Sequence, residues 1–227
     1  MFDLRRSVRG FTLIEMMIAL VIVAAALAFV MPSAVDWIRN VRIRAAAEEL
    51  MNELTRARVE AIKRNRQVGF QVVDNLSAAC ALSLSGRSWV ISQFTAVGLC
   101  NTALITPATP ADLTVTGFAT AQADPLIIAR GTAPADAQVG FNVYSIAGVN
   151  TAGPLVFNSF GQLVTPATLA NVPVNIDVRD ATPADCRPIP PAAGTGTLRC
   201  MRITINSGGQ IRMCDPSEQT VGDTRAC

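Results

Sequence analysis

The stretch FTLIEMMIALVIVAAALAFV, residues 11–30, decides the architecture of this 227-residue chain. Every residue in it is apolar except Thr12 and Glu15. At 1.5 Å rise per residue, this stretch makes a helix about 30 Å long, which matches the hydrocarbon thickness of a bilayer. We therefore expect a helix that can span a membrane.

Charges at the start of the chain predict how this helix is oriented. Three arginines precede the apolar stretch, namely Arg5, Arg6 and Arg9. Basic residues beside a spanning helix stay on the cytoplasmic side, so the chain beyond Pro32 is expected on the periplasmic side. Glu15 is costly, because a carboxylate costs about 2.5 to 3.5 kcal/mol at the centre of a spanning helix and less near its end. The cost predicts that Glu15 has a function.

A removable secretory signal is the alternative interpretation of the same features. Four small residues, Ala24, Ala25, Ala26 and Ala28, would offer its cleavage site. Such a signal has no use for Glu15, however, and the helical pattern continues past Pro32 into residues 36–66. Intact mass distinguishes the two interpretations, because a chain that starts near Phe29 would be a soluble periplasmic domain.

Residues 36–66 have the pattern of an amphipathic helix. Apolar residues recur at steps of three and four: Ile43, Ala47, Leu50, Leu54, Ala57 and Ala61. Oppositely charged neighbours on the other faces stabilise a helix by only about 0.2 to 0.5 kcal/mol per pair. The apolar face must therefore pack on a larger body. Pro32 is expected to bend or loosen the helix between its two halves.

From Gln67 onward, short runs rich in Val, Ile, Thr and Phe alternate with turn residues. The predicted strands are Val68–Val73, Trp89–Phe94, Leu113–Phe118, Leu126–Arg130, Val139–Ile146, Leu155–Phe157, Val174–Val178, Leu198–Asn206 and Gln210–Met213. Ser207-Gly208-Gly209 is a hairpin turn between the last two. Residues 102–112 and 182–196, rich in Pro and Ala, are predicted to be long loops.

These patterns together predict an α+β fold. A long N-terminal helix, membrane-spanning over residues 11–35 and amphipathic over residues 36–66, packs on a β-rich head of residues 67–227.

The head contains all six cysteines, which indicates disulfides formed in an oxidising compartment. Six cysteines allow 15 pairings. Proximity in the sequence favours Cys80–Cys100, Cys186–Cys200 and Cys214–Cys227, each worth roughly 3 kcal/mol.

Catalysis is disfavoured by what the chain lacks. It contains no His and a single Lys, Lys63, so the side chain used most often as a general base, a triad member or a proton shuttle, and often as a zinc ligand, is missing. Gly194-Thr195-Gly196 does not continue as a dinucleotide fingerprint. Asp177 and Asp180 are a pair of carboxylates of the kind that glycoside hydrolases use, but no other feature of the sequence supports such a site. The 19 basic and 17 acidic residues nearly balance, which gives no general attraction to nucleic acid. We expect no enzymatic activity, no cofactor and no metal.

The residues Gly10-Phe11-Thr12-Leu13-Ile14-Glu15, with arginines before them and an apolar run after them, resemble the prepilin signature of type IV pilins and type II secretion pseudopilins. This resemblance implies that residues 1–10 are a leader, which prepilin peptidase cuts between Gly10 and Phe11. It also implies that Phe11 is N-methylated, and that Glu15 helps to align an incoming subunit through the terminal amine of a neighbour.

Further motifs resemble the GspH/FimT group of minor pilins. They are Ala45–Leu50, Thr55–Ala61, Val156–Gly161, Arg202–Asn206 and Gly208-Gly209. Cys214-Asp215-Pro216 is similar to minor pilins of the pilus-type FimU/FimT kind.

The resemblance implies a single-pass inner-membrane protein that later joins a pilus. Its expected partners are prepilin peptidase, the major pilin and other minor pilins, and its expected role is priming of pilus assembly near the tip. Two alternatives remain, namely a type II secretion pseudopilin and a DNA-binding minor pilin for natural transformation. The candidate DNA contacts are Arg202, Arg212 and Arg225, although Asp215, Glu218 and Asp223 lie close to them in the sequence.

Overall fold

A computed structural model describes most of the chain. It covers residues 10–105, 118, 124–133, 139–145, 153–164, 173–180, 186–187, 196–218, 220 and 222–227; for residues 29–33, 139–145 and 180 it covers the backbone alone. The chain divides into two compact units, residues 1–38 and residues 39–227.

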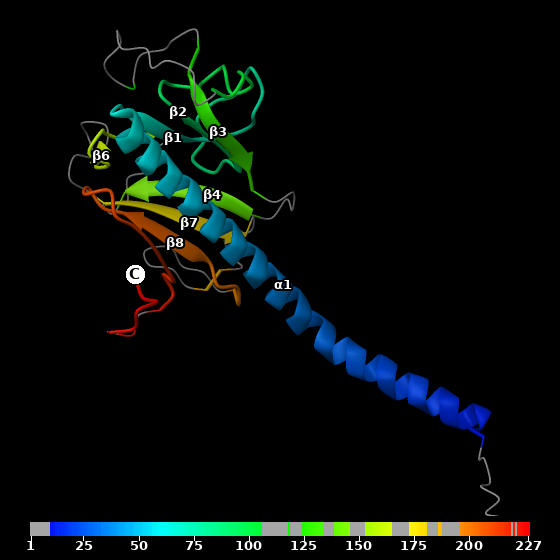
Figure 1. Ribbon diagram of the computed structural model, residues 1–227. Helices are drawn as coiled ribbons and strands as arrows, with labels where there is room; N and C mark the ends of the chain where they lie inside the picture. The colour runs from blue at the N-terminus through cyan, green and yellow to red at the C-terminus, as the bar shows by residue number, and fades with distance from the viewer. Residues whose placement is uncertain are drawn as a thin grey trace, which may run out of the picture. The chain divides into compact units, whose positions relative to one another are not determined.

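Helix α1, Leu13–Arg64, is uninterrupted through Pro32 and belongs to both units (Figure 1). It ends two residues before the predicted boundary at Arg66. Asn65 adopts a left-handed conformation with φ 51°, and the Arg66 N–H donates to the Ala61 carbonyl at 3.1 Å. This is the Schellman arrangement, with Asn in the position usually held by Gly. Within the described residues, no helix is both long enough and apolar enough to cross a membrane.

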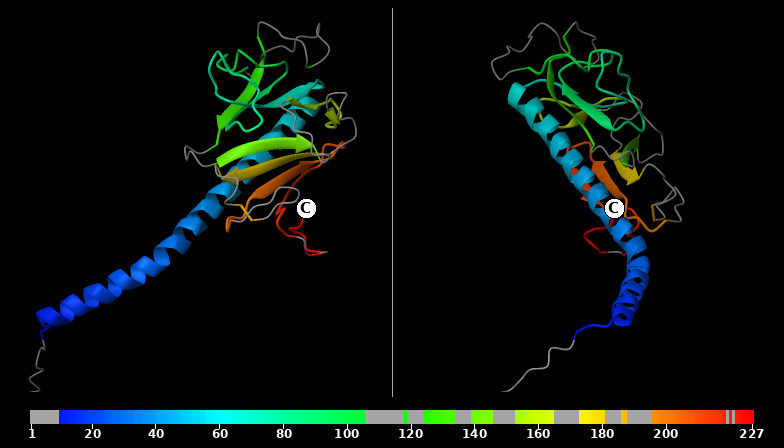
Figure 2. Two further views of the ribbon diagram at one scale, coloured as in Figure 1. Left: turned by 180° about the vertical axis from the view of Figure 1, so that it is seen from behind. Right: turned by 90° about the vertical axis from the view of Figure 1, so that its right-hand side faces the viewer.

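The second unit contains two antiparallel sheets. In the first, the strand order is β3 (Ile127–Thr132), β2 (Ser88–Ser92), β1 (Val68–Val73), β5 (Leu155–Phe157) and β6 (Leu163–Val164). In the second, the order is β4 (Val139–Ser145), β7 (Val174–Asp180), β8 (Met201–Ile205) and β9 (Ile211–Cys214). Figure 2 shows the strands of both sheets on one side of the part of α1 that belongs to this unit.

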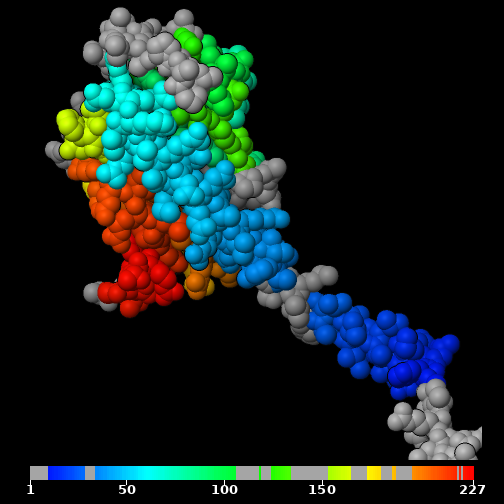
Figure 3. All heavy atoms as spheres, viewed as in Figure 1, coloured from blue at the N-terminus to red at the C-terminus, as the bar shows by residue number. Residues whose placement is uncertain are grey.

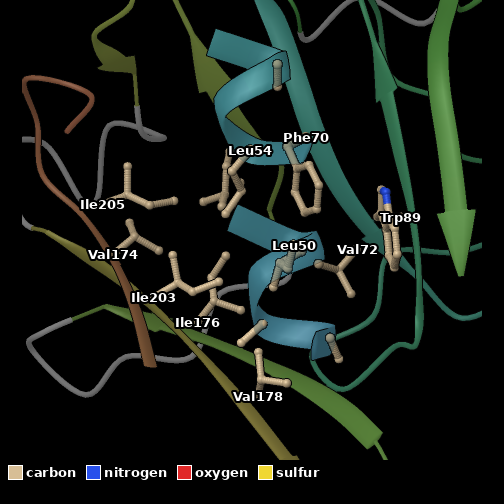
Figure 4. Packing of buried hydrophobic residues seen from close by; sticks show 14 of the residues in the cluster. Leu50, Leu54, Phe70, Val72, Trp89, Val174, Ile176, Val178, Ile203 and Ile205 are labelled. Atoms are coloured by element: carbon tan, nitrogen blue, oxygen red, sulfur yellow. The ribbon is translucent and has the colours of Figure 1, made fainter. Parts of the chain in front are cut away.

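The core lies where α1 meets both sheets. Leu50 and Leu54 lie between side chains of the first sheet, such as Phe70, and side chains of the second, such as Ile176 and Ile203 (Figure 4). All six residues of the predicted apolar helix face are fully buried: Ile43, Ala47, Leu50, Leu54, Ala57 and Ala61. The α+β prediction, with a helix packed on a β-rich head, is confirmed.

Most predicted strands coincide with observed ones. β1 and β5 have the predicted bounds, whereas the strand predicted over residues 198–206 shortens to Met201–Ile205. The pair Leu163–Val164 was not predicted, because two residues are too few to show an alternating pattern. The predicted strand Leu113–Phe118 lies outside the described residues except for Phe118, and so do most residues of the two predicted long loops.

Three disulfides close loops within the second unit. They join Cys80 to Cys100, Cys186 to Cys200 and Cys214 to Cys227, which are the pairs favoured by proximity in the sequence. The last bridge holds the C-terminal segment against β9, where the Asp215 N–H also donates to the Arg225 carbonyl at 2.7 Å.

Candidate functional site

Gly10 and Phe11 lie just before α1 and are accessible. Phe11 is 79% exposed, and no atom lies within 4 Å of the position that a Cβ on Gly10 would occupy. The fold therefore does not require glycine at position 10. Any requirement for Gly10 must come from a molecule that acts on this segment.

Glu15 and Thr12 cap the start of α1. The Glu15 N–H donates to Thr12 Oγ1 at 3.3 Å, and the Thr12 N–H donates to Glu15 Oε2 at 3.5 Å. This reciprocal pair is a capping box, in which two side chains satisfy backbone donors that a helix start leaves unpaired. Sequence reasoning missed it, although Thr-x-x-Glu is the pattern of such a box. Glu15 thus has a local partner in the isolated chain.

The first half of α1 exposes apolar side chains on every face. From Phe11 to Leu27, the large apolar side chains with a described environment are between 53% and 79% exposed. A soluble surface helix would bury one apolar stripe and expose a polar one. The arrangement indicates a surface that another apolar environment covers.

The last turns of α1 are joined to both sheets at one point. Arg58 Nε donates to the Gly161 carbonyl at 3.0 Å. Gly161, in the β5–β6 turn, and Gly209, in the β8–β9 turn, both have positive φ, and a Cβ on Gly209 would collide with the Gly161 carbonyl. Figure 3 shows the cyan end of α1 beside the yellow β5–β6 segment. Three of the motifs noted in the sequence therefore meet in space.

Two of the three candidate DNA contacts, Arg202 and Arg225, are paired with carboxylates. Asp177 is fully buried, accepts from Arg202 Nε at 2.8 Å, and also pairs with Arg179. Arg225 pairs with Asp223 at 2.7 Å. Arg212 is exposed on β9. These carboxylates offset the charge that a phosphate backbone would need.

The Asp177–Arg202 pair is also a result that sequence reasoning missed. The two residues face each other across β7 and β8 in the strand register, 25 positions apart in the sequence. The sequence alone offers Asp177 only as one member of a carboxylate pair with Asp180. Its buried ion pair with Arg202 gives it a structural role instead.

Hydrogen bonds lower the pKa values of two carboxylates, Glu218 and Asp223, in the segment after β9. The side-chain and backbone N–H groups of Arg225 lower the pKa of Asp223 from 3.8 to about 2. The hydroxyl and backbone N–H of Thr220 lower the pKa of Glu218.

On α1, burial raises the pKa of Glu49, and the nearby carboxylate of Glu53 adds to this effect. These groups shape local structure and do not converge on a reacting centre.

The described residues contain no group of three or more His, Cys, Asp or Glu side chains that could hold a metal ion. The side chains that do converge, at the start of α1 and at its junction with the sheets, bind other parts of the chain.

Comparison with known proteins gives two family matches. Residues 5–31 match the prokaryotic N-terminal methylation motif, and residues 46–209 match the family described as type II transport protein GspH. No curated protein matches the chain.

Two similar solved structures are crystal forms of the type IV minor pilin FimU from Pseudomonas aeruginosa strain PAO1. The form in space group P21 is 14% identical, with a TM-score of 0.44 over 82% of this chain and 97% of that chain. The form in space group P65 is 15% identical, with a TM-score of 0.41 over 78% of this chain and 97% of that chain.

Proposed function

The chain belongs to the GspH family of type II transport proteins, and from that premise we propose that it is a minor pilin that helps to prime and assemble a type IV pilus. It is a structural subunit without turnover, present in few copies and placed near the pilus tip. Its partners are the major pilin, other minor pilins and prepilin peptidase.

One observation carries this proposal, namely the exposed apolar surface of α1 from Leu13 to Leu27. Large exposed apolar surfaces mark contacts with membranes or other proteins. The match to the methylation motif over residues 5–31 covers the same segment. Lipid covers this surface before assembly, while the chain sits in the inner membrane with its head in the periplasm. Helices of neighbouring subunits cover it afterwards.

Processing is proposed between Gly10 and Phe11. Both residues precede the helix and are exposed, so a peptidase reaches the bond without unwinding α1. Cleavage removes Arg5, Arg6 and Arg9 and leaves a free terminal amine on Phe11, which then receives a methyl group from a methyl donor.

Glu15 changes partner during assembly in this proposal. In the isolated chain its carboxylate reaches the Thr12 N–H at 3.5 Å, which is a long and weak contact. The terminal amine of a neighbouring subunit's first residue is a cation, and a charged hydrogen bond is stronger than a neutral one. The carboxylate therefore leaves its own helix cap for the neighbour's amine.

The test uses the full chain in its host. Deleting the chain is expected to reduce the number of pili seen by electron microscopy, and the wild-type chain is expected to restore it. Glu15→Ala is expected to be processed normally but to restore few pili. Thr12→Ala is the matched control, because it removes the Oγ1 half of the capping box and keeps the carboxylate. Equal loss of pili in the two variants would show that Glu15 acts only as a cap.

A type II secretion pseudopilin is the second candidate, favoured by the family match over residues 46–209. The two candidates share one architecture and differ in the machine that they join. If deletion leaves pili intact and blocks export of secreted enzymes, the secretion assignment replaces the pilus assignment.

A further inference from the structure

Among the residues of the second unit whose side chains the structure describes, the most exposed large apolar side chain lies in the turn between β5 and β6. Phe160 is 80% exposed at its tip. Single exposed apolar residues are common on protein surfaces and need no explanation by themselves. Phe160 differs because the turn around it is fixed by many hydrogen bonds.

The side chain of Asn158 organises this turn. Its Oδ1 accepts from the backbone N–H groups of Phe160 at 3.0 Å and Gln162 at 2.9 Å. Its Nδ2 donates to Gln162 Oε1 at 3.1 Å, and its backbone exchanges further bonds with Gly161 and Gln162. The backbone that carries Phe160 is therefore restricted before any partner arrives.

Contacts with α1 and with the β8–β9 turn fix the β5–β6 turn to the rest of the head. The Gly161 carbonyl accepts from Arg58 on α1, and the Leu163 N–H donates to the Ser207 carbonyl at 3.0 Å. Gly209 packs against Gly161 from the β8–β9 turn. A rigid anchor loses little conformational freedom on binding, so more of its contact energy remains as affinity.

Exposed apolar side chains of α1 lie next to the turn that carries Phe160, and basic residues flank them in the sequence. Ile62 lies against Gly161, the residue that follows Phe160, and one helical turn earlier stands Val59. Ile62 is 47% exposed and Val59 is 52% exposed. We call Phe160, Val59 and Ile62 the Phe160 patch. Residues 58–64 of α1 contain three basic side chains and one acidic side chain.

We infer that the Phe160 patch docks the head of a neighbouring pilin-type subunit, which offers an apolar pocket edged by carboxylates. Charge complementarity selects this partner, because Lys63 at the edge of the patch has a 69% exposed side chain and only a 3.9 Å contact with Glu60. Phe160 fills the pocket, since buried aromatic residues at the centre of an interface supply most of its binding energy. This inference rests on the proposed function.

The first experiment replaces Phe160 in the full chain and counts pili. Phe160→Ser is expected to accumulate, be processed and melt like the wild type, because the side chain is already in solvent. It is expected to weaken docking about thirtyfold or more and so to restore few pili in the deletion strain. Leu104→Ser is the matched control, because Leu104 is 49% exposed elsewhere on the head. Lys63→Glu is expected to act like Phe160→Ser.

The outcomes separate this inference from the proposed function. If deletion of the whole chain does not change pilus number, the proposed function fails. If deletion removes pili and Phe160→Ser restores them as well as Leu104→Ser does, only the docking inference fails.

The second experiment identifies the partner directly. A benzoylphenylalanine placed at position 160 of the full chain in living cells is expected, on illumination, to yield an adduct with a pilin-type subunit, recognised by mass spectrometry from its processed N-terminus. The same photoreactive residue at position 104 is expected to yield none. An adduct with a second copy of this chain, with a protein of another class, or with nothing would overturn the inference.

Discussion

Two neighbouring glycines in the β8–β9 turn have different roles although both stand in the same short motif. Gly209 has φ 77° and lies against the Gly161 carbonyl, whereas nothing lies within 4 Å of a Cβ on Gly208. A left-handed conformation favours glycine, and so close an approach of two backbones leaves no room for a side chain. The fold thus depends on the second glycine alone.

Gly209→Ala is expected to lower the free energy of unfolding by about 1 to 3 kcal/mol, because alanine must adopt an unfavourable φ and push the Gly161 carbonyl aside. Gly208→Ala is expected to change it by less than about 0.5 kcal/mol. Urea unfolding followed by the fluorescence of buried Trp89 measures both values. Equal effects of the two variants would contradict the role given to Gly209.

Asp223 is expected to titrate well below an ordinary aspartate. Its pKa is lowered to about 2 by hydrogen bonds from Arg225, so the folded state favours its ionised form. The contribution of this pair is therefore fully present above pH 3.8 and is lost as pH falls through about 2. Carboxyl chemical shifts from NMR measure the pKa. In Arg225→Ala the pKa of Asp223 is expected to rise toward its ordinary value, and an unchanged value would exclude Arg225 as the cause.

At the scale of elements, patterns with one clear period could be predicted and contacts between distant segments could not. The helix face from Ile43 to Ala61 and the strand Val68–Val73 follow from apolar spacing, because burial on a larger body dictates that spacing. The pairing of Asp177 with Arg202 depends on which strands become neighbours, and no local pattern records this. The exposure of Phe160 likewise depends on how the β5–β6 turn is held.

The second half of α1 is expected to derive its stability from the sheets. Leu54→Ala removes a fully buried side chain between the two sheets and is expected to cost about 2 to 5 kcal/mol. Val59→Ala on the same helix is the control, because Val59 is 52% exposed and its loss is expected to cost little. Thermal unfolding monitored by circular dichroism compares them. Similar melting temperatures for the two variants would mean that α1 is stable without the sheets.

At the scale of the whole molecule, the start of the chain separates processing from folding. Gly10→Ala introduces no contact, so the variant is expected to fold like the wild type. If a peptidase cuts after Gly10, the variant is expected to keep its full mass, whereas the wild type starts at methylated Phe11. Intact mass spectrometry of the purified chains decides this. A wild-type chain that starts near Phe29 would identify residues 1–28 as a removable signal.

The sequence predicts the part of the candidate site at the N-terminal end of the chain, but not the part at the junction of α1 with the sheets. The pattern in residues 10–15 occupies six consecutive positions, so it can be seen without knowledge of the fold. The junction of Arg58, Gly161 and Gly209 was visible only as three separate motifs. Their meeting point required the order of the strands.

The three disulfides have a consequence for how the chain matures. Each cysteine is joined to the next one along the chain: first to second, third to fourth, and fifth to sixth. A chain that is exported with its N-terminal end first exposes the cysteines in that order. An oxidant that joins each newly exposed thiol to the free thiol before it then produces the native disulfides. Correct connectivity is then a product of the order of emergence, and an enzyme that reshuffles mispaired bridges has nothing to repair.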